Sequence, residues 1–105
     1  MIEYMGILFD WDDSKEEINK KKHDIAFDEA ITAFGDEYHQ IYYDNINSDE
    51  EDRFNLIGYS EKRKLLIVCH CYRNGDDITR IISARRATKQ ESKLYGGVIW
   101  IKAII

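Results

Sequence analysis

Hydrophobic residues recur along this chain with two different spacings, and each spacing predicts a different kind of element. Phe27, Ala30, Ile31 and Phe34 fall at positions i, i+3, i+4 and i+7. This is the spacing of one face of an amphipathic helix. Gly35 stands where a glycine commonly caps the end of a helix. The pattern therefore predicts a helix that runs from Phe27 to Phe34 and is capped by Gly35.

The segment before this helix contains an aromatic, β-branched run and then a polar run. The run from Tyr4 to Trp11 predicts a first strand. Ser14 and Glu17 have the spacing of a capping box, which marks the start of a helix. We expect a short polar helix from Lys15 to His23, with Ile18 as almost its only apolar residue.

After residue 35, apolar residues gather in four short runs that are separated by polar turns. Such runs predict strands, here at His39–Tyr43, Arg53–Tyr59, Leu65–Tyr72 and Ile78–Arg85. The acidic, Asn-rich residues 44–52 predict a loop between the first two strands. Asn74-Gly75 predicts a type I′ hairpin turn between the last two. Gly58 marks a bulge or a close approach of two backbones.

The order of these elements predicts an α+β fold. We expect an antiparallel β-sheet with two N-terminal helices packed on it and a C-terminal helix from Lys89 to Tyr95. Residues 1–95 should form this single domain. Residues 96–105 form an apolar C-terminal extension. Because an exposed apolar strand is an aggregation hazard, we expect the extension to be an edge strand or an interface segment.

Charge is distributed unevenly along the chain, which has a formal net charge of −5. Residues 1–60 contain 5 basic and 16 acidic residues, whereas residues 61–105 contain 10 basic and 4 acidic residues. Exposed charges that lie further apart than a Debye length of about 10 Å act nearly independently. The second half can therefore present a basic face to a polyanion although the whole chain is acidic.

Three arginines, Arg80, Arg85 and Arg86, lie in and just after the last predicted strand. Guanidinium groups gathered at a strand end favour the binding of phosphates or carboxylates, because each offers several charge-assisted donors. The alternative is that these arginines line an exposed sheet edge and the solvated start of the following helix. The residues alone leave both interpretations open.

The two cysteines, Cys69 and Cys71, are separated by one residue in a predicted strand, so they point to one face and His70 points to the other. Two thiolates do not complete a tetrahedral zinc site. We expect reduced, buried thiols, no bound metal and no cofactor. Because we see neither a secretory signal nor an apolar run long enough to span a membrane, we expect a cytoplasmic protein.

Three groups of short motifs follow one another over residues 7–95. The first is Phe9-Asp10-Trp11-Asp12 with Lys15, and the second is Asn19 and Lys22-His23 followed by Ile25, Phe27, Ala30 and Phe34. The third comprises Arg53-Phe54, Ile57-Gly58, Leu65–Val68, Arg73, Arg80–Ala87, Glu91 and Tyr95. In this order and spacing, the motifs resemble those of the BrnT family of bacterial toxins.

This resemblance implies a small ribonuclease toxin of a type II toxin–antitoxin system, with a RelE-like fold, that inhibits translation by cleaving RNA. It also implies a BrnA-like antitoxin with a ribbon-helix-helix DNA-binding domain, so that the complex represses its own operon and DNA is bound only through the antitoxin. The chain departs from the family in two places. Asp24 stands where the family usually has glycine, and the apolar tail after Tyr95 is not typical of the family.

RNA cleavage without a metal needs a proton acceptor for the 2′-hydroxyl group and cations around the phosphorus centre. We predict His23 as the proton-transfer group, since histidine titrates near neutral pH. Arg53 begins a predicted strand and Arg85 ends one, and we expect both at one rim of the sheet, where they clamp a phosphate. His23, Arg53 and Arg85 thus form the predicted catalytic site. For RNA binding we predict Lys22, Arg73, Arg80, Arg86, Lys89 and Tyr95.

Each of these residues also has a purely structural interpretation. His23 could cap or pack its helix, Arg53 could pair with the acidic loop before it, and Glu91 could pair with Arg85. The chain likewise has an alternative function, as a catalytically inactive partner-binding module that acts as co-repressor with a DNA-binding antitoxin. Asp24 motivates this alternative, because it places a negative charge beside the predicted site.

Overall fold

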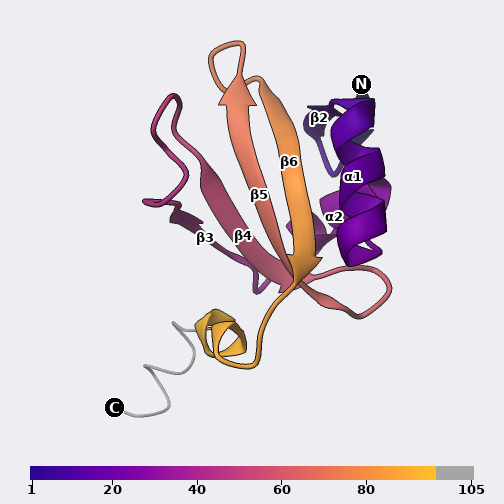
Figure 1. Cartoon of the computed structure of the whole chain (residues 1–105), viewed down its shortest axis with the longest axis vertical. Helices are drawn as coiled ribbons and strands as arrows, with labels where there is room; N and C mark the ends of the chain where they lie inside the picture. The colour runs from indigo at the N-terminus through magenta and orange to yellow at the C-terminus, as the bar shows by residue number, and fades with distance from the viewer. Residues whose placement is uncertain (97–105) are drawn as a thin grey trace.

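The computed structural model of the chain describes residues 1–96, which form one six-stranded sheet with α2 behind it and α1 beside β6 (Figure 1). The spatial order of the strands is β1-β2-β6-β5-β4-β3. Their bounds are β1 Ile2–Tyr4, β2 Ile7–Trp11, β3 Gln40–Tyr43, β4 Phe54–Tyr59, β5 Leu65–Arg73 and β6 Ile78–Arg86. The helical elements are α1 Asp13–His23, α2 Phe27–Ala30 and the 3₁₀ helices η1 Ile31–Gly35 and η2 Glu91–Leu94.

The α+β class predicted from the sequence is confirmed. No helix within residues 1–96 is long and apolar enough to cross a membrane. The apolar extension predicted at residues 96–105 lies, apart from Gly96, outside the described residues.

One strand pairing departs from the predicted antiparallel sheet. β2 runs parallel to β6, with Asp10 opposite Arg80, whereas the other neighbouring strands pair antiparallel. The single strand predicted from Tyr4 to Trp11 is a hairpin of β1 and β2, turned at Met5 and Gly6, whose φ angles are 53° and 80°. The direction of β2 could not be read from a local pattern, because its partner residues lie 70 positions away along the chain.

α1 begins after Asp12 and not at a capping box of Ser14 and Glu17. The Asp12 carboxylate accepts hydrogen bonds from the backbone N–H groups of Ser14 (2.8 Å) and Lys15 (3.4 Å), so it fills the cap position before Ser14 can. The helix ends at Asp24, which has a left-handed φ of 57°. Glycine adopts this conformation most easily and aspartate is among the few other residues that tolerate it, so Asp24 can form this turn.

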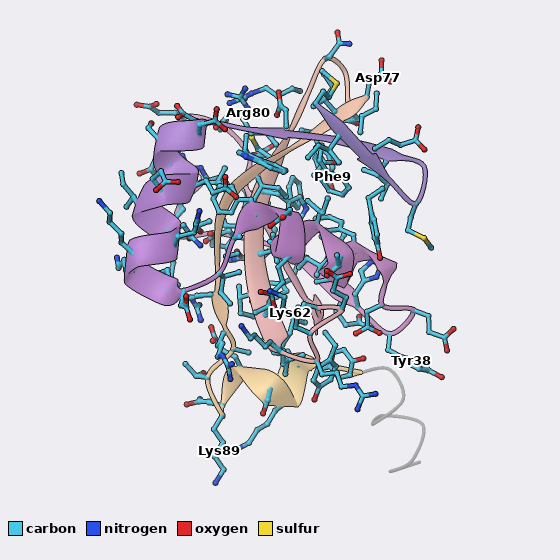
Figure 2. The ribbon with its side chains drawn as sticks, turned by 90° about the vertical axis from the view of Figure 1, so that its right-hand side faces the viewer. Phe9, Tyr38, Lys62, Asp77, Arg80 and Lys89 are labelled. Carbon is cyan, nitrogen blue, oxygen red and sulfur yellow. The ribbon has the colours of Figure 1, made fainter. Side chains whose placement is uncertain are left out.

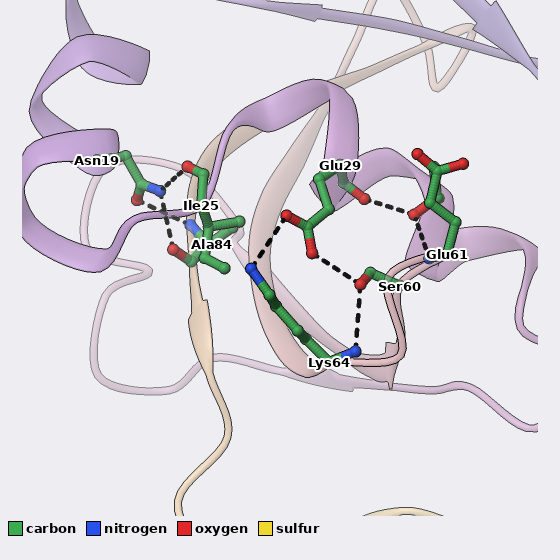
Figure 3. Close-up of polar contacts among 8 residues, drawn as sticks. Asn19, Ile25, Glu29, Ser60, Glu61, Lys64 and Ala84 are labelled. Carbon is green, nitrogen blue, oxygen red and sulfur yellow. Dashed lines mark hydrogen bonds and ion pairs between the residues drawn. The ribbon is translucent and has the colours of Figure 1, made fainter.

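Asn19 fixes α1 to β6 through three hydrogen bonds (Figure 3). Its Nδ2 donates to the carbonyl oxygens of Ile25 and Ala84, each at 2.9 Å, and its Oδ1 accepts from the N–H of Ala84 at 3.0 Å. The side chain is buried. One amide therefore joins α1, the turn after it and the C-terminal part of β6, and it holds the C-terminal end of α1 beside that strand.

The helix predicted from Phe27 to Phe34 is present, but only its first part is α-helical. α2 continues directly into the 3₁₀ helix η1, which ends at Gly35. Gly35 does not have the left-handed conformation of the predicted cap; a Cβ atom there would lie 2.9 Å from the hydroxyl of Tyr4, so the glycine provides space. Gly58 has the predicted close backbone approach, since its Cβ would lie 2.9 Å from the carbonyl oxygen of Ala33.

The apolar stripe of α2 and η1 packs on one face of the sheet and forms the core. Phe9 lies inside this layer (Figure 2) and contacts Phe34 edge to face, with ring centroids 4.9 Å apart. His70 of β5 lies in the same layer with 0% of its surface exposed, in contact with Phe34 and Phe54. On the same side, the buried Glu29 accepts a hydrogen bond from Ser60 at 2.8 Å (Figure 3).

The end of the described chain is less helical than predicted. Instead of a helix from Lys89 to Tyr95, it contains the single 3₁₀ helix η2. Thr88 and Glu91 cap it reciprocally: the N–H of Thr88 donates to the Glu91 carboxylate (2.9 Å), and the N–H of Glu91 donates to the Thr88 hydroxyl (3.1 Å). The backbone of Tyr95 is extended, with φ −71° and ψ 130°, so the helix ends at Leu94 after one turn.

The hairpin predicted at Asn74-Gly75 is present between β5 and β6. The turn is centred one residue later than predicted: the N–H of Asp77 donates to the carbonyl oxygen of Asn74 at 3.3 Å, and the central residues Gly75 and Asp76 have the positive φ angles of a type I′ turn, 62° and 73°. The connection has four residues instead of the two of the simplest hairpin, since Arg73 pairs with Ile78.

Candidate functional site

The sheet face turned away from the core carries two adjoining hollows. The larger hollow, of about 570 Å³, is lined by Tyr42, Tyr43, Asp44, Asn45, Ile46, Asn47, Arg53, Asn55, Ile67, Cys69, Ile82, Ser83, Arg85 and Glu91. The smaller hollow, of about 390 Å³, is lined by Lys15, Ile18, Asn19, Lys22 and His23 of α1 and by Ile82, Ser83 and Arg85 of β6. Because Ile82, Ser83 and Arg85 belong to both, they form a ridge between the two hollows.

The three predicted catalytic residues all line these hollows, although they do not share one rim. His23 and Arg85 line the smaller hollow, and Arg53 and Arg85 line the larger one. The predicted common rim is wrong, because β4 and β6 both run antiparallel to β5 and their opposite ends therefore lie apart. In the sheet register, Arg85 of β6 lies opposite Ile67 of β5, and Ile67 lies opposite Ile57 of β4. Because Ile57 is four residues beyond Arg53, the backbone positions of Arg53 and Arg85 are offset by about 13 Å along the strand direction.

His23 is the last residue of α1, and the hydrogen bonds of Asn19 to Ala84 hold this end of the helix beside β6. Lys22, a predicted RNA-binding residue, lines the same hollow. Burial, followed by the positive charges of Lys22 and Arg85, lowers the pKa of the His23 imidazole. A lowered pKa favours the neutral ring near pH 7, and a neutral imidazole has a nitrogen that can accept a proton.

Arg85 is held in place by Glu91. Its Nη1 and Nη2 each donate to one oxygen of the Glu91 carboxylate at 2.7 Å, so the structural interpretation of Glu91 is confirmed. This bidentate pair raises the pKa of Arg85 and lowers the pKa of Glu91 to about 2. Glu91 engages the end of the guanidinium fork, and the Nε edge of Arg85 takes no part in the pair.

Arg53 lies just before β4, in the wall of the larger hollow. Its backbone is fixed on both sides: its N–H donates to the hydroxyl of Ser48 (3.0 Å), and its carbonyl oxygen accepts from the N–H of Asp44 (2.9 Å). Within residues 1–96, its guanidinium forms no ion pair with the acidic loop, and its buried Nε has no hydrogen-bond partner. The guanidinium is thus positioned without an internal carboxylate.

Comparison with known families assigns the chain. A model of the family described as the ribonuclease toxin BrnT of a type II toxin–antitoxin system matches residues 11–91. The chain belongs to the BrnT family. It is therefore a toxin of the ribonuclease type, and a type II system implies an antitoxin partner.

A solved structure agrees with the fold of this BrnT family chain. The crystal structure of the Brucella abortus ribonuclease toxin BrnT superposes with a TM-score of 0.60 at 20% sequence identity, and the match covers 79% of this chain and 99% of that one. At this identity the likeness concerns the fold alone. The comparison with curated protein sequences gave no match.

Two predicted RNA-binding arginines of this BrnT family chain are tied to carboxylates. Arg80 donates through Nε and Nη2 to Asp10, at 3.1 and 3.2 Å, and Arg73 pairs with Glu51 of the loop before β4. Both arginines line a small pocket that also includes Lys15, Asp12 and Glu51, next to the smaller hollow. These arginines therefore anchor the sheet and the loop while they border the basic end of the site.

Three other predicted RNA-binding residues, Arg86, Lys89 and Tyr95, line neither hollow. Arg86 is exposed at the end of β6, and Lys89 extends into solvent below it (Figure 2). The Tyr95 hydroxyl donates to Asp36 at 2.6 Å, and its ring packs against Tyr59 with centroids 5.0 Å apart. These contacts show that Tyr95 attaches the end of η2 to the rest of the domain.

Tyr42 and Asn55 are site residues that the sequence analysis missed. They form a cross-strand pair of β3 and β4, and both line the larger hollow. Strand alternation would have placed Asn55 on the same face as Arg53, two residues earlier. The position of Tyr42 needed the β3–β4 register, which the long acidic loop between the two strands conceals.

The two cysteines are free and buried, as predicted. Cys69 belongs to the lining of the larger hollow, and burial raises the pKa of its thiol to about 11. It is therefore a neutral, weakly polar group and not a thiolate nucleophile. Within the described part of the chain, no group of three or more His, Cys, Asp or Glu side chains is placed to hold a metal ion.

Proposed function

We propose that this ribonuclease toxin is a metal-independent endoribonuclease that cleaves RNA on the ridge between the two hollows. The position of Arg85 carries the proposal, because Arg85 lines both hollows and its charge reaches His23. The scissile phosphodiester lies on the ridge at Ser83 and Arg85. His23 faces this phosphodiester from the smaller hollow, and Arg53 binds the RNA strand from the far side of the larger hollow.

In the proposed reaction the RNA supplies its own nucleophile. His23 takes the proton of the 2′-hydroxyl group, the 2′ oxygen attacks phosphorus, and the bond from phosphorus to the 5′ oxygen breaks. The departing 5′ oxygen takes a proton from water, which leaves a 2′,3′-cyclic phosphate and a 5′-hydroxyl end. Arg85 stabilises the negative charge that develops on the phosphorane oxygens.

The other predicted basic residues extend the path of the RNA. Lys22 lies beside the proposed scissile phosphate, in the smaller hollow. Arg73 and Arg80 are paired, yet 40% and 38% of their side-chain surfaces are exposed, so each retains donors that face solvent. We place the RNA backbone past these two arginines and Lys15.

We also propose the identity of the partner. A BrnA-like antitoxin with a ribbon-helix-helix domain would cover the hollows and supply all contacts with DNA. RNA cleavage by the free toxin would inhibit translation. The antitoxin requirement follows from the type II family, and the BrnA-like identity is the proposed refinement.

The test is the cleavage of single-stranded RNA by the purified chain in the presence of EDTA. We expect the wild type to cut, and we expect His23→Ala and Arg85→Ala each to lower kcat/KM about 100-fold or more, the usual effect of losing a general base or an electrostatic contact to the transition state. Arg53→Ala should raise KM more than it lowers kcat.

Lys21→Ala is the matched control, because Lys21 is exposed on α1 and lines neither hollow. It should keep the wild-type rate. Two results would contradict the proposal: cleavage that stops on chelation and returns with Mg²⁺, or a double variant Arg53→Ala/Arg85→Ala that retains full activity.

A second candidate function is the catalytically inactive partner-binding module. It is favoured by the pairing of Arg73, Arg80 and Arg85 with internal carboxylates, which occupies part of the donor set that RNA would use. Expression without the antitoxin separates the two candidates. Growth arrest that His23→Ala relieves supports the nuclease, whereas harmless expression of the wild type supports the inactive module.

A further inference from the structure

We infer that the larger hollow binds a single unstacked nucleobase of the RNA and that Tyr42 and Asn55 select this base. The inference rests on the proposed function, because Arg85 fixes where the scissile phosphate lies. It adds a base-specificity site to the reaction: the nucleotide next to the cut is held by its base as well as by its phosphates.

The lining of the hollow includes two arginines, whose long side chains can bind the RNA backbone on either side of one base. A nucleotide within a strand has a phosphate on each side of its sugar and base. Arg85 and Arg53 both line the hollow, and their backbone positions are offset by about 13 Å along the strand direction. The buried Nε of Arg53 has no hydrogen-bond partner in the described chain, and a phosphate oxygen would supply one.

The wall of the hollow offers an aromatic ring and an amide side by side. Tyr42 and Asn55 are directly opposite each other in the β3–β4 register, so their side chains are neighbours on one face. Burial, followed by the negative charge of Glu91, raises the pKa of Tyr42, so its hydroxyl stays neutral. Single-stranded RNA is generally recognised by bases that stack on aromatic side chains and hydrogen-bond through their edges.

The floor of the hollow is weakly polar. It includes Ile67 and the neutral thiol of Cys69, next to the ridge residue Ile82. A weakly polar surface beside an aromatic ring suits the flat face of a base. A paired duplex base would not enter, because its edge and faces are already occupied, so the substrate class is single-stranded RNA.

The rim of the hollow is preformed. The Asp44 carboxylate accepts hydrogen bonds from the N–H of Ile46 (3.2 Å) and from the N–H and Nδ2 of Asn47 (3.3 and 3.0 Å). These bonds close a turn directly after β3, next to Tyr42. The hollow therefore exists before RNA binds, as a selective site requires.

The experiment is cleavage of a random-sequence single-stranded RNA pool, with the ends of the products sequenced. We expect the wild type to show a base preference at one position next to the cut. Tyr42→Ala and Asn55→Ala should each reduce that preference about tenfold, the scale of losing a stacking or base-edge contact. Tyr42→Phe keeps the ring and should retain more of the preference than Tyr42→Ala. Lys22→Ala, in the other hollow, should slow cleavage without changing the preference.

A binding measurement separates failure of this inference from failure of the proposed function. The His23→Ala chain is titrated with each of the four nucleoside monophosphates, and the side-chain amide of Asn55 is followed by NMR. We expect its resonance to shift with one nucleotide more than with the others. Folding of each variant is checked by the same spectra, and Asn55→Asp serves where Asn55→Ala does not fold.

The possible outcomes distinguish the base-site inference from the nuclease proposal. Cleavage by the wild type with no base preference, or with a preference that Tyr42→Ala and Asn55→Ala leave unchanged, overturns the inference and leaves the nuclease proposal standing. Selective nucleotide binding at Asn55 without any cleavage supports the base site and overturns the nuclease proposal. Titrations that leave the Asn55 amide unmoved overturn the base site directly.

Discussion

Arg53 differs from Arg73, Arg80 and Arg85 in what surrounds its guanidinium group. Arg73, Arg80 and Arg85 each donate to a carboxylate that the fold supplies, whereas the Nε of Arg53 is buried without a partner among residues 1–96. A buried donor that lacks an acceptor costs about 1–3 kcal/mol. At the scale of single residues, this unsatisfied donor is the strongest reason to place an anion in the larger hollow.

His70 provides a prediction about pH. It is fully buried among aromatic rings, and its Nδ1 lies 3.0 Å from the carbonyl oxygen of Val68. Burial lowers its pKa from 6.5 to about 4. Between these two values the unfolded chain binds a proton at this position and the folded chain does not. The free energy of unfolding should therefore fall as pH drops from 6.5 toward 4, with a contribution of at most about 1.4 kcal/mol per pH unit.

Urea unfolding at a series of pH values measures this contribution. The variant His70→Gln can keep a hydrogen bond to Val68 but does not titrate, so its stability should fall less steeply than that of the wild type between pH 6.5 and 4. Above pH 6.5 the two curves should run parallel. Equal slopes for the two proteins below pH 6.5 would show that His70 does not control acid stability.

Among the elements, α1 depends mainly on polar side chains for its position. Its apolar residue Ile18 is 64% exposed, so little hydrophobic surface holds the helix. The Asn19 amide attaches the helix to Ile25 and Ala84, and the Glu16 carboxylate accepts a hydrogen bond from the N–H of Phe27 at 2.8 Å. We predict that Asn19→Ala lowers the free energy of unfolding by about 2–4 kcal/mol, because it leaves buried backbone groups unpaired. It should also lower RNA cleavage, since His23 lies one turn further along the same helix.

Chemical denaturation and the cleavage assay test this prediction together. Lys21→Ala, an exposed substitution on the same helix, should change stability by no more than about 0.5 kcal/mol and keep activity. If Asn19→Ala were as stable and as active as Lys21→Ala, the hydrogen bonds of Asn19 would not position α1.

The elements that the sequence predicted well are those with a strong local pattern. The helical stripe at Phe27–Phe34 and the long strands β5 and β6 follow from periodicity and from continuous apolar runs. The β1–β2 hairpin was missed because Met5-Gly6 carries no standard turn signal inside an apolar run. The parallel pairing of β2 with β6 and the single turn of η2 depend on contacts that no local pattern encodes.

For the site, too, local sequence features were predictive and long-range arrangement was not. Residue chemistry was enough to single out His23, Arg53 and Arg85, and the structure places all three on two adjoining hollows. Their arrangement was predicted incorrectly, because the relative direction of β4 and β6 depends on the order of strands in the sheet. Tyr42 was missed for the same reason, since its place in the wall depends on register.

For the molecule as a whole, the question is how an acidic chain binds a polyanion. The formal net charge is −5, and the first 60 residues carry most of the acidic groups. Several basic residues of the second half are neutralised locally, as Arg73, Arg80 and Arg85 are by Glu51, Asp10 and Glu91. The basic groups that line the hollows are Lys15, Lys22, Arg53 and Arg85. RNA affinity should therefore depend on a few cations and not on net charge.

The number of basic groups in the hollows predicts the salt dependence of RNA binding. Each phosphate neutralised on a single strand contributes about −0.7 to the slope of log K against log salt concentration, so three to four contacts give a slope of about −2 to −3. The measurement uses a 2′-O-methyl RNA, which lacks the nucleophilic hydroxyl and is not cut. Lys22→Ala and Arg53→Ala should each make the slope shallower by about 0.7, because each removes one contact.

Lys21→Ala changes the net charge by the same amount as Lys22→Ala. Lys21 is the neighbouring residue on α1, but it lies outside both hollows. If binding depended on the general field of the chain, the two variants would have the same slope, since they have the same net charge. If instead the RNA lies in the hollows, only Lys22→Ala changes the slope appreciably. A slope near zero for the wild type would exclude phosphate contacts at this face, and with them the route by which an acidic protein of this size binds RNA.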